Sequence, residues 1–312
     1  MKKFNFNSHS LAILTVAALL FCCTQSGQAQ SQAMQEAQKY FNAQDWPQAE
    51  QAFKAITESQ PENGRAWLFL GAALHNQEKF HDAIAAYAKA DALGFSQPRA
   101  RYNLACSQAR LGEIDASFAW LEKAMQAGFS QVNTLKTDKD LQALRTDTRF
   151  AEIVQKADQN ARPCEYNPDC RAFDFWIGEW EVFMPGGQKA GENIIKKTLN
   201  GCMLMENWTG IGGSIGKSMN YFDPATKKWK QLWVDGAGGH MSYGGVFTDG
   251  ALKFEGYQIQ GNGRKGLFKM AFTPQENGDV RQYIEQSLDG GKTYNVWFDG
   301  MYKKKKATDG AH

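Results

Sequence analysis

Hydrophobic positions follow two different periods, one in each half of the chain. From residue 30 to about 161 they recur every three or four positions, which is the spacing of an amphipathic helix. From about residue 162 onward they alternate with polar positions in short runs, which is the spacing of a half-buried strand. The pattern predicts a two-domain α plus β protein: a helical domain at 30–158, an all-β domain at 162–306 and a tail at 307–312.

The helical half repeats with a period of 34 residues, and each unit contains two amphipathic helices. Small residues recur where two helices would cross closely, and aromatic or aliphatic residues recur where one unit would pack on the next. The matching columns are Ala37, Gly71 and Ala105; Trp46, Phe80 and Ile114; Ala49, Ala83 and Ser117; Phe53, Tyr87 and Leu121; and Ile56, Ala90 and Ala124.

This pattern resembles the tetratricopeptide repeat over about residues 33–129. The segments Trp67–Gly71 and Ala83–Tyr87 match its signature best. Two further helical stretches, at 135–141 and 144–150, are expected to cap the open apolar end of the repeats.

The resemblance implies a protein- or peptide-binding groove, because the first helix of each repeat lines the concave face. Arginine and asparagine side chains there could hold the carboxylate of a peptide. Transferring that face by the repeat register gives Arg65, Leu68, His75, Asn76, Arg99, Tyr102 and Arg110. Two alternatives stay open: a solvated surface of a small scaffold, and a surface that docks on the second domain or on a sister subunit.

The second half contains about ten short strands separated by glycine-containing turns. Hairpin-length connections with no intervening helix predict an antiparallel up-and-down β-barrel, because closure removes exposed strand edges. The expected strands are Trp180–Phe183, Ile194–Leu199, Met203–Trp208, Lys217–Phe222, Trp229–Asp235, Met241–Phe247, Ala251–Gly256, Leu267–Thr273, Val280–Ser287 and Tyr294–Tyr302.

Five ordered segments of this half resemble an uncharacterised bacterial domain family related to the calycins, the superfamily of lipocalins, fatty-acid-binding proteins and nitrobindins. They are Phe173–Val182, Leu199–Trp208, Asp223–Trp229, Gln231–Asp235 and Ser287–Tyr294. Gly178-Glu-Trp180 is similar to the Gly-x-Trp that closes the barrel mouth in lipocalins. The resemblance implies a lipocalin-like barrel and, because the family's activity is not established, no particular reaction.

A barrel of this size fills its interior with side chains or holds one small ligand. Aromatic walls with a few acids and one arginine would fit a small aromatic or amphipathic ligand that carries a polar group. The candidate ligand-binding residues are Trp180, Glu206, Trp208, Trp229, Gln231, Trp233, Asp235, Arg281, Tyr283, Glu285 and Trp297. The competing interpretation is a satisfied ion-pair network inside the barrel, or strands turned the other way.

Catalysis is the alternative function: Glu206 and Glu285 could act as acid and base in a cofactor-free isomerase or hydrolase. No nucleophile signature or phosphate-binding loop accompanies them. No metal site is expected, since the five histidines are scattered and no Cys-x-x-Cys occurs. The resemblance to nitrobindins suggests haem as a cofactor. In nitrobindins the residue that binds the haem iron comes from near the end of the chain, whereas His240 lies in the middle of this domain. No cofactor is therefore expected.

Residues 1–29 have the pattern of a signal peptide. Two lysines precede an apolar run at 11–23, and Gly27-Gln-Ala29 supplies small residues for cleavage before Gln30. The alternative is a lipid anchor on Cys22 or Cys23. The run is too short to be a transmembrane segment. We therefore expect a periplasmic or secreted protein.

Four cysteines follow the signal, and export permits disulfides. Cys164 and Cys170 flank Asn167-Pro168 and are predicted to pair, while Cys106 and Cys202 are expected to be buried thiols. The all-β half contains most of the glycine, since 24 of the 30 glycines lie after residue 161. The formal net charge of the whole chain is only +2. So weak a field argues against nucleic acid as a partner.

Overall fold

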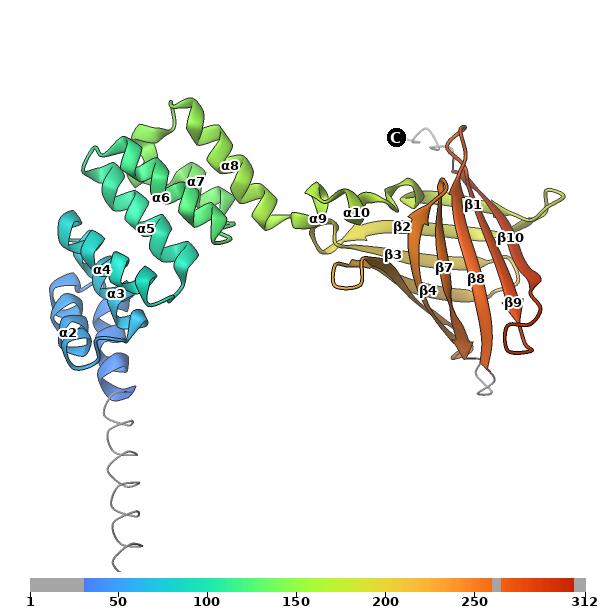
Figure 1. Cartoon of the computed structure of the whole chain (residues 1–312), viewed down its shortest axis with the longest axis horizontal. Helices are drawn as coiled ribbons and strands as arrows, with labels where there is room; N and C mark the ends of the chain where they lie inside the picture. Colours follow the sequence, from blue (N-terminus) through green and yellow to red (C-terminus); the bar gives the residue numbers. More distant parts are fainter. Residues whose placement is uncertain (1–30, 260–264, 306–312) are drawn as a thin grey trace, which may run out of the picture. The chain divides into compact units, whose positions relative to one another are not determined.

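A computed structural model describes residues 31–259 and 265–305 (Figure 1). The chain divides into two compact units, with the boundary between Ala161 and Arg162. The predicted signal peptide, the alternative lipid-anchor cysteines and the predicted tail lie outside the described residues. Within the described ranges no helix is both long and apolar enough to cross a membrane.

The N-terminal unit is a run of antiparallel helices. Phe41 of a helix at residues 31–42 contacts Phe53 of α2, α3 pairs with α4, and α5 pairs with α6. The bounds are α2 Trp46–Ser59, α3 Gly64–His75, α4 Phe80–Ala92, α5 Gln97–Arg110, α6 Ile114–Gln126, α7 Val132–Thr137, the 3-10 helix η1 Lys139–Leu144, and α8 Thr148–Ala161.

The residues of the 34-residue columns form the core of this unit. Phe53, Tyr87 and Leu121 are buried, and Phe53 stacks on Phe69 with ring centroids 5.4 Å apart. Gly71 is required at its position because a Cβ atom there would lie 2.6 Å from the ring of Tyr87. The repeat period thus fixed both which side chains are buried and where two helices cross.

The predicted capping segment closes the apolar end of the repeats. Leu135, Leu141 and Leu144 are fully buried together with side chains of α5 and α6. The start of α2 illustrates how local chemistry sets helix ends, since Asp45 caps it by accepting the N–H of Gln48 at 3.3 Å. The N-terminal unit is therefore the expected helical repeat with its cap.

The C-terminal unit is a closed antiparallel barrel of ten strands. Each strand pairs with its neighbours in sequence, and β1 pairs with β10 to close the barrel, so the up-and-down topology is confirmed. The bounds are β1 Gly178–Phe183, β2 Lys189–Thr198, β3 Met203–Gly210, β4 Ile215–Asp223, β5 Lys228–Asp235, β6 His240–Thr248, β7 Ala251–Ile259, β8 Lys265–Pro274, β9 Val280–Ser287 and β10 Asn295–Lys304.

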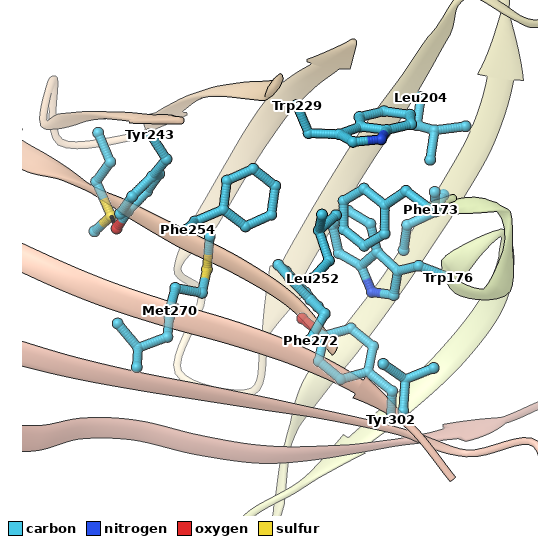
Figure 2. Packing of buried hydrophobic residues seen from close by; sticks show 14 of the residues in the cluster. Phe173, Trp176, Leu204, Trp229, Tyr243, Leu252, Phe254, Met270, Phe272 and Tyr302 are labelled. Carbon is cyan, nitrogen blue, oxygen red and sulfur yellow. Dashed lines mark hydrogen bonds between the residues drawn. The ribbon is translucent and has the colours of Figure 1, made fainter. Parts of the chain in front are cut away.

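Three short helices precede the barrel: α9 Pro163–Tyr166, α10 Pro168–Arg171 and the 3-10 helix η2 Asp174–Trp176. They bring Phe173 and Trp176, both fully buried, into one end of the barrel. Figure 2 shows these two rings facing Trp229, Leu252 and Phe272 from the strands. Phe173 and Trp176 stack with centroids 4.8 Å apart. This end of the interior is filled by aromatic and aliphatic side chains, and we call it the closed half.

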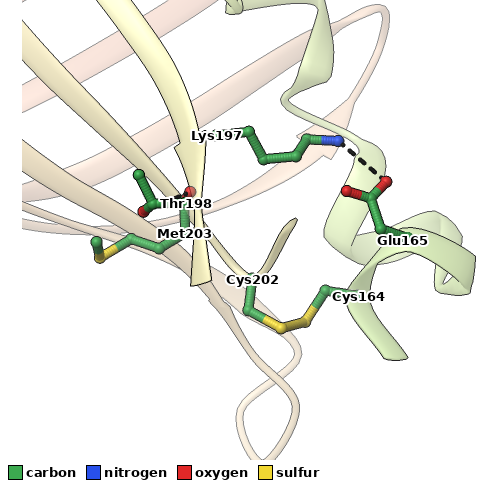
Figure 3. The surroundings of a disulfide bond; sticks show 6 residues. All are labelled: Cys164, Glu165, Lys197, Thr198, Cys202 and Met203. Atoms are coloured by element: carbon green, nitrogen blue, oxygen red, sulfur yellow. Dashed lines mark hydrogen bonds and ion pairs between the residues drawn. A yellow bond between two sulfur atoms is a disulfide. The ribbon is translucent and has the colours of Figure 1, made fainter. Parts of the chain in front are cut away.

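A disulfide joins Cys164 in α9 to Cys202, which follows the short 3-10 helix η3 Leu199–Gly201 (Figure 3). The predicted Cys164–Cys170 pair is wrong, and Cys170 is a buried free thiol. The expectation of a thiol at Cys202 is wrong for the same reason. Folding of the barrel brings Cys202 to a Cα–Cα distance of 5.0 Å from Cys164 across 38 positions of sequence. Cys106 is a buried free thiol, as expected.

Candidate functional site

The other end of the barrel interior, which we call the open half, holds a cavity of about 330 Å³. Its lining comes from strands β2, β3, β5, β6, β8, β9 and β10 and from the β3–β4 turn. The lining residues are Ala190, Glu206, Trp208, Ser214, Gln231, Trp233, Met241, Tyr243, Met270, Gln282, Ile284, Trp297, Phe298 and Tyr302.

Alternation along β5 turns one set of side chains inward. Trp229 and Gln231 are buried, and Trp233 follows on the same face, whereas Leu232 and Val234 are 38% and 47% exposed on the outer wall. Gly216 of β4 leaves the space that Trp233 occupies, because a Cβ atom there would lie 2.1 Å from its ring. A glycine on one strand thus admits the large ring of the next strand.

Glu206 is the one carboxylate among the lining residues, and it is almost completely buried. Its Oε1 accepts a hydrogen bond from Asn193 Nδ2 at 2.6 Å, and its Oε2 accepts one from Ser218 Oγ at 2.5 Å. Both donors are uncharged. The carboxyl group is therefore oriented by β2 and β4 while no lysine, arginine or histidine lines the cavity with it.

A chain of polar side chains extends from Glu206 in both directions. On one side Asn220 donates to Ser218 Oγ at 2.8 Å, and Gln231 donates to Asn220 Oδ1 at 2.8 Å. On the other side Asn193 donates to the hydroxyl of Tyr302 at 3.2 Å, and that hydroxyl donates to Gln282 Oε1 at 2.7 Å. Such a connected network fixes the position of its carboxylate.

Burial raises the pKa of Glu206 to about 7, although the hydrogen bonds from Ser218 and Asn193 act in the opposite direction. Tyr243 and Tyr302 are the other titratable side chains of the cavity. Burial, together with the charge of Glu206, raises the pKa of each well above its ordinary value. Both tyrosines therefore stay neutral near pH 7, and Glu206 is the group that changes charge there.

The structure brings some of the predicted ligand-binding residues together and separates others. Glu206, Trp208, Gln231, Trp233 and Trp297 line the cavity. Trp180 and Trp229 lie in the packed closed half, where Trp180 Nε1 donates to Trp176 O and Trp229 Nε1 donates to Asp169 O. Asp235 ends β5 and accepts the N–H groups of Ala237 and Gly239 in the following turn. These last three residues therefore have structural contacts outside the cavity.

The predicted inner face of β9 is wrong. Val280, Gln282 and Ile284 are buried on one face, so Arg281, Tyr283 and Glu285 lie on the outer wall, and the last residue, Ser287, is also buried. Arg281 forms a two-pronged ion pair there with Asp299 of β10, with both N–O distances 2.8 Å. The outer position keeps the arginine hydrated, whereas the inner face would have required a buried partner. Glu285 consequently cannot face Glu206, and the proposed acid–base pair does not form.

Several lining residues were missing from the sequence-based set: Met241, Tyr243, Met270, Gln282, Ile284, Phe298 and Tyr302. Period-two alternation in β6 and β8 could have identified the first three, because it separates Met241 and Tyr243 from Ser242, and Met270 from Lys269. Phe298 has no such signal, since a register shift between Val296 and Phe298 interrupts β10.

The helical unit places its predicted groove residues in two groups. Asp140 of η1 accepts hydrogen bonds from His75 at 2.8 Å and Arg110 at 3.0 Å, and Tyr102 donates to Asp138 at 2.5 Å. These three groove residues hold the cap, because η1 folds against α5. These three side chains therefore have partners within the helical unit, and their role in a peptide-binding groove stays a prediction.

The remaining groove residues are exposed, apart from Leu68, which is buried in the repeat core. Arg65 lies with its guanidinium 5.6 Å from the ring centroid of Phe69, and Arg99 lies one repeat further along. Asn76 donates to Ala72 O at the end of α3.

One group among the described residues has the spacing of metal ligands: Cys106, Asp138 and Asp140 have one ligand atom each within 4.8 Å of the others. Tyr102 hydrogen-bonds Asp138, and His75 and Arg110 both bond Asp140. The two carboxylates are therefore already partnered within the protein. His240 starts β6 and does not line the cavity.

Comparison with known proteins identifies the repeats. Residues 34–97 match the tetratricopeptide-repeat family. The chain also matches a curated chloroplastic protein of Arabidopsis thaliana, with 30% identity over 61 residues, or 20% of this chain. The match covers 18% of that curated relative, so the chain spans less than a fifth of its length.

Three solved structures that are similar to this chain each cover less than half of it. MamA has 18% identity and a TM-score of 0.37, with 44% of this chain and 81% of MamA covered. The TPR2B domain of yeast Sti1, solved as a complex with pHsp70, has 24% identity and a TM-score of 0.31, with 42% and 96% covered. The Yersinia enterocolitica chaperone SycD has 18% identity and a TM-score of 0.32, with 41% and 90% covered.

Proposed function

We propose that the barrel binds one small aromatic or amphipathic ligand in its open half. The observation that carries this proposal is the cavity of about 330 Å³, walled by aromatic side chains and containing one oriented, buried carboxylate. Binding sites for small molecules combine mostly apolar walls with a few placed polar groups, and this volume is near their lower end. The ligand is therefore small.

The test fills the cavity and measures binding of a neutral aromatic probe, naphthylmethanol, by fluorescence titration. Ile284 lines the cavity from β9, so Ile284→Trp adds a ring to its interior. We expect the probe's affinity to fall by about tenfold or more because the added ring occupies the ligand's volume. Tyr283→Trp is the matched control, since Tyr283 is the preceding residue and lies on the outer wall. Equal affinities in the two variants would exclude the cavity as the binding site.

We also propose that the repeat region binds a protein or peptide through the first helices of its repeats. Repeats of this kind use an extended concave surface for binding. Arg65 and Arg99 remain exposed at equivalent positions of α3 and α5, and together they can hold an acidic or C-terminal carboxylate group.

A peptide library with free C-terminal carboxylates, read by fluorescence anisotropy, tests the repeat surface. The double variant Arg65→Ala, Arg99→Ala should weaken selected peptides by about tenfold or more, because two charge-assisted contacts are lost. Lys54→Ala is the control, since Lys54 is an exposed cation on the second helix of its pair. An equal loss in the control would show that only overall charge matters.

We retain export and a lipocalin-like ancestry of the barrel as proposals. The Cys164–Cys202 disulfide supports an oxidising compartment, where such bonds persist. Intact-mass measurement of the protein from its own cells distinguishes a chain that begins at Gln30 from one that carries a lipid on Cys22 or Cys23.

A further inference from the structure

The charges around the cavity are unbalanced. Of the 14 lining residues one is a carboxylic acid, two are tyrosines and none is basic. Basic side chains of the barrel strands have partners elsewhere: on the outer wall Arg281 pairs with Asp299 and Lys253 pairs with Asp249. Lys197 of β2 pairs with Asp174 of η2. The ionised form of Glu206 therefore has hydrogen-bond donors inside the barrel and no cation among the residues that line the cavity.

A buried charge without a counter-charge is costly, and a ligand that brings the opposite charge recovers part of that cost. The two hydrogen bonds of Glu206 come from Asn193 and Ser218, so each carboxylate oxygen keeps lone-pair capacity for a further donor. A carboxylate ligand would instead place a second negative charge beside the first with no cation between them.

The aromatic walls of the cavity also favour a positively charged ligand. Trp208, Trp233 and Trp297 line it together with Tyr243 and Phe298, and the negative face of an aromatic ring attracts a cation. These rings also supply apolar area for the uncharged part of a ligand.

We infer that the cavity selects a cationic amphipathic ligand, an amine with an aromatic or short apolar group, whose ammonium meets Glu206 while its apolar part contacts the tryptophans. This inference rests on the proposed ligand-binding function of the barrel and names its substrate class. It excludes free fatty acids and other carboxylates as the preferred ligands.

Three probes that share a naphthylmethyl group and differ in charge test the inference on the full-length protein: naphthylmethylamine, naphthylmethanol and the naphthylacetate anion. At pH 8 we expect the amine to bind about tenfold or more tightly than the alcohol, and the acetate to bind more weakly than the alcohol. If the alcohol binds but the amine has no advantage, the inference is wrong and the proposed cavity stands. If none of the three binds, the proposed function fails as well.

Glu206→Gln should reduce the protein's affinity for the amine to its affinity for the alcohol, because the substitution removes the negative charge at nearly constant shape. Glu255→Gln is the matched control, since Glu255 is an exposed carboxylate on the outer wall of β7. An amine preference that survives Glu206→Gln would overturn the assignment of the ammonium to this carboxylate.

The pH dependence of binding gives a second readout that needs no variant. Glu206 has a pKa of about 7, and the titratable groups that face it, Tyr243 and Tyr302, stay neutral. The wild-type affinity for the amine should rise between pH 6 and pH 8 while that for the alcohol stays constant, and binding at pH 7 should release protons to the buffer. Calorimetry in buffers of different ionisation heat measures that release, and its absence would contradict the inference.

Discussion

Aromatic side chains are prominent in both halves of the barrel interior, yet one half is filled by side chains and the other holds a cavity. In the closed half Phe173 and Trp176 from outside the barrel enter among the strand side chains, and both are fully buried. In the open half three tryptophans line a cavity together with the hydrogen-bonded polar side chains around Glu206. The difference arises because a segment outside the ten strands fills one half and leaves the other open.

Two tryptophans on one face of β5 make this difference concrete. Trp229 is 3% exposed, is in edge contact with Phe173 at 5.5 Å between centroids, and donates its indole N–H to Asp169 O. Trp233 points inward on the same strand and borders the cavity. An inward aromatic residue is thus a core residue or a ligand contact depending on what packs against it from elsewhere in the chain.

The largest expected effect is on the closed half. Trp176→Ala should lower the free energy of unfolding of the barrel by about 3–5 kcal/mol, because it empties a fully packed site. Urea unfolding followed by near-ultraviolet circular dichroism measures this. Trp297→Ala removes the same ring from a half-exposed position and is the control; a loss as large as that for Trp176→Ala would contradict the distinction between the halves.

The disulfide holds the segment that fills the closed half. Replacing Cys164 and Cys202 together by serine should cost about 2–4 kcal/mol, because the unfolded chain regains the freedom of a long loop. Cys170→Ser should leave the bridge intact, as thiol-specific alkylation and peptide mass mapping would show. Loss of the bridge in the Cys170→Ser variant would instead support the pairing that the sequence favoured.

The carboxylate of the open half should make stability depend on pH. The pKa of Glu206 in the folded protein is about 7, above its ordinary value of 4.5. Between those values the folded state holds a proton that the unfolded chain has lost, so this group's contribution falls as pH rises from about 4.5 to 7 and is flat above. The fall is about 3 kcal/mol at 1.36 kcal/mol for each pH unit.

Glu206→Gln isolates that contribution, because the other carboxyl groups of the protein titrate in both forms. The difference in unfolding free energy between variant and wild type should move in favour of the variant across this pH range. Parallel curves for the two proteins would show that Glu206 titrates in the folded state as it does in the unfolded chain.

The smallest expected change is in binding by the open half. Trp233→Ala should weaken a bound aromatic probe by about 1–3 kcal/mol through lost aromatic area. Leu232→Ala should alter affinity by less than about 0.5 kcal/mol, because the adjacent side chain lies on the outer wall. Fluorescence titration of both variants compares the two faces of one strand, and equal losses would contradict the inward assignment of the site.

Much of the fold could be predicted from local pattern. The 34-residue columns gave the buried positions of the helices, including Phe53 and Tyr87, since each repeat packs only on its neighbours. Alternation and glycine turns predicted ten antiparallel strands, because hairpins connect residues that are close in sequence. Both predictions depend on contacts between neighbouring segments.

Which face of a strand points into the barrel was harder to predict where both faces carry polar and apolar groups. On β5 the inward face is much the larger, and alternation was sufficient. On β9 one face carries Gln282 and the other carries Arg281. The sequence does not show that Asp299 lies on the outer wall, where it pairs with Arg281. The cap presents the same difficulty, because Asp140 reaches His75 across 65 positions of the chain.

The sequence by itself determined the two periods, and with them the helical repeat, the antiparallel barrel and the residues that each local period buries. Tertiary structure alone decided the partner of Cys164, the side of β9 that faces inward and the lack of a basic side chain beside Glu206 in the cavity lining. The physical reason is range. Hydrophobic periodicity acts between neighbouring elements, whereas a disulfide, an ion pair or an unbalanced buried charge depends on groups that only closure of the barrel brings together or keeps apart.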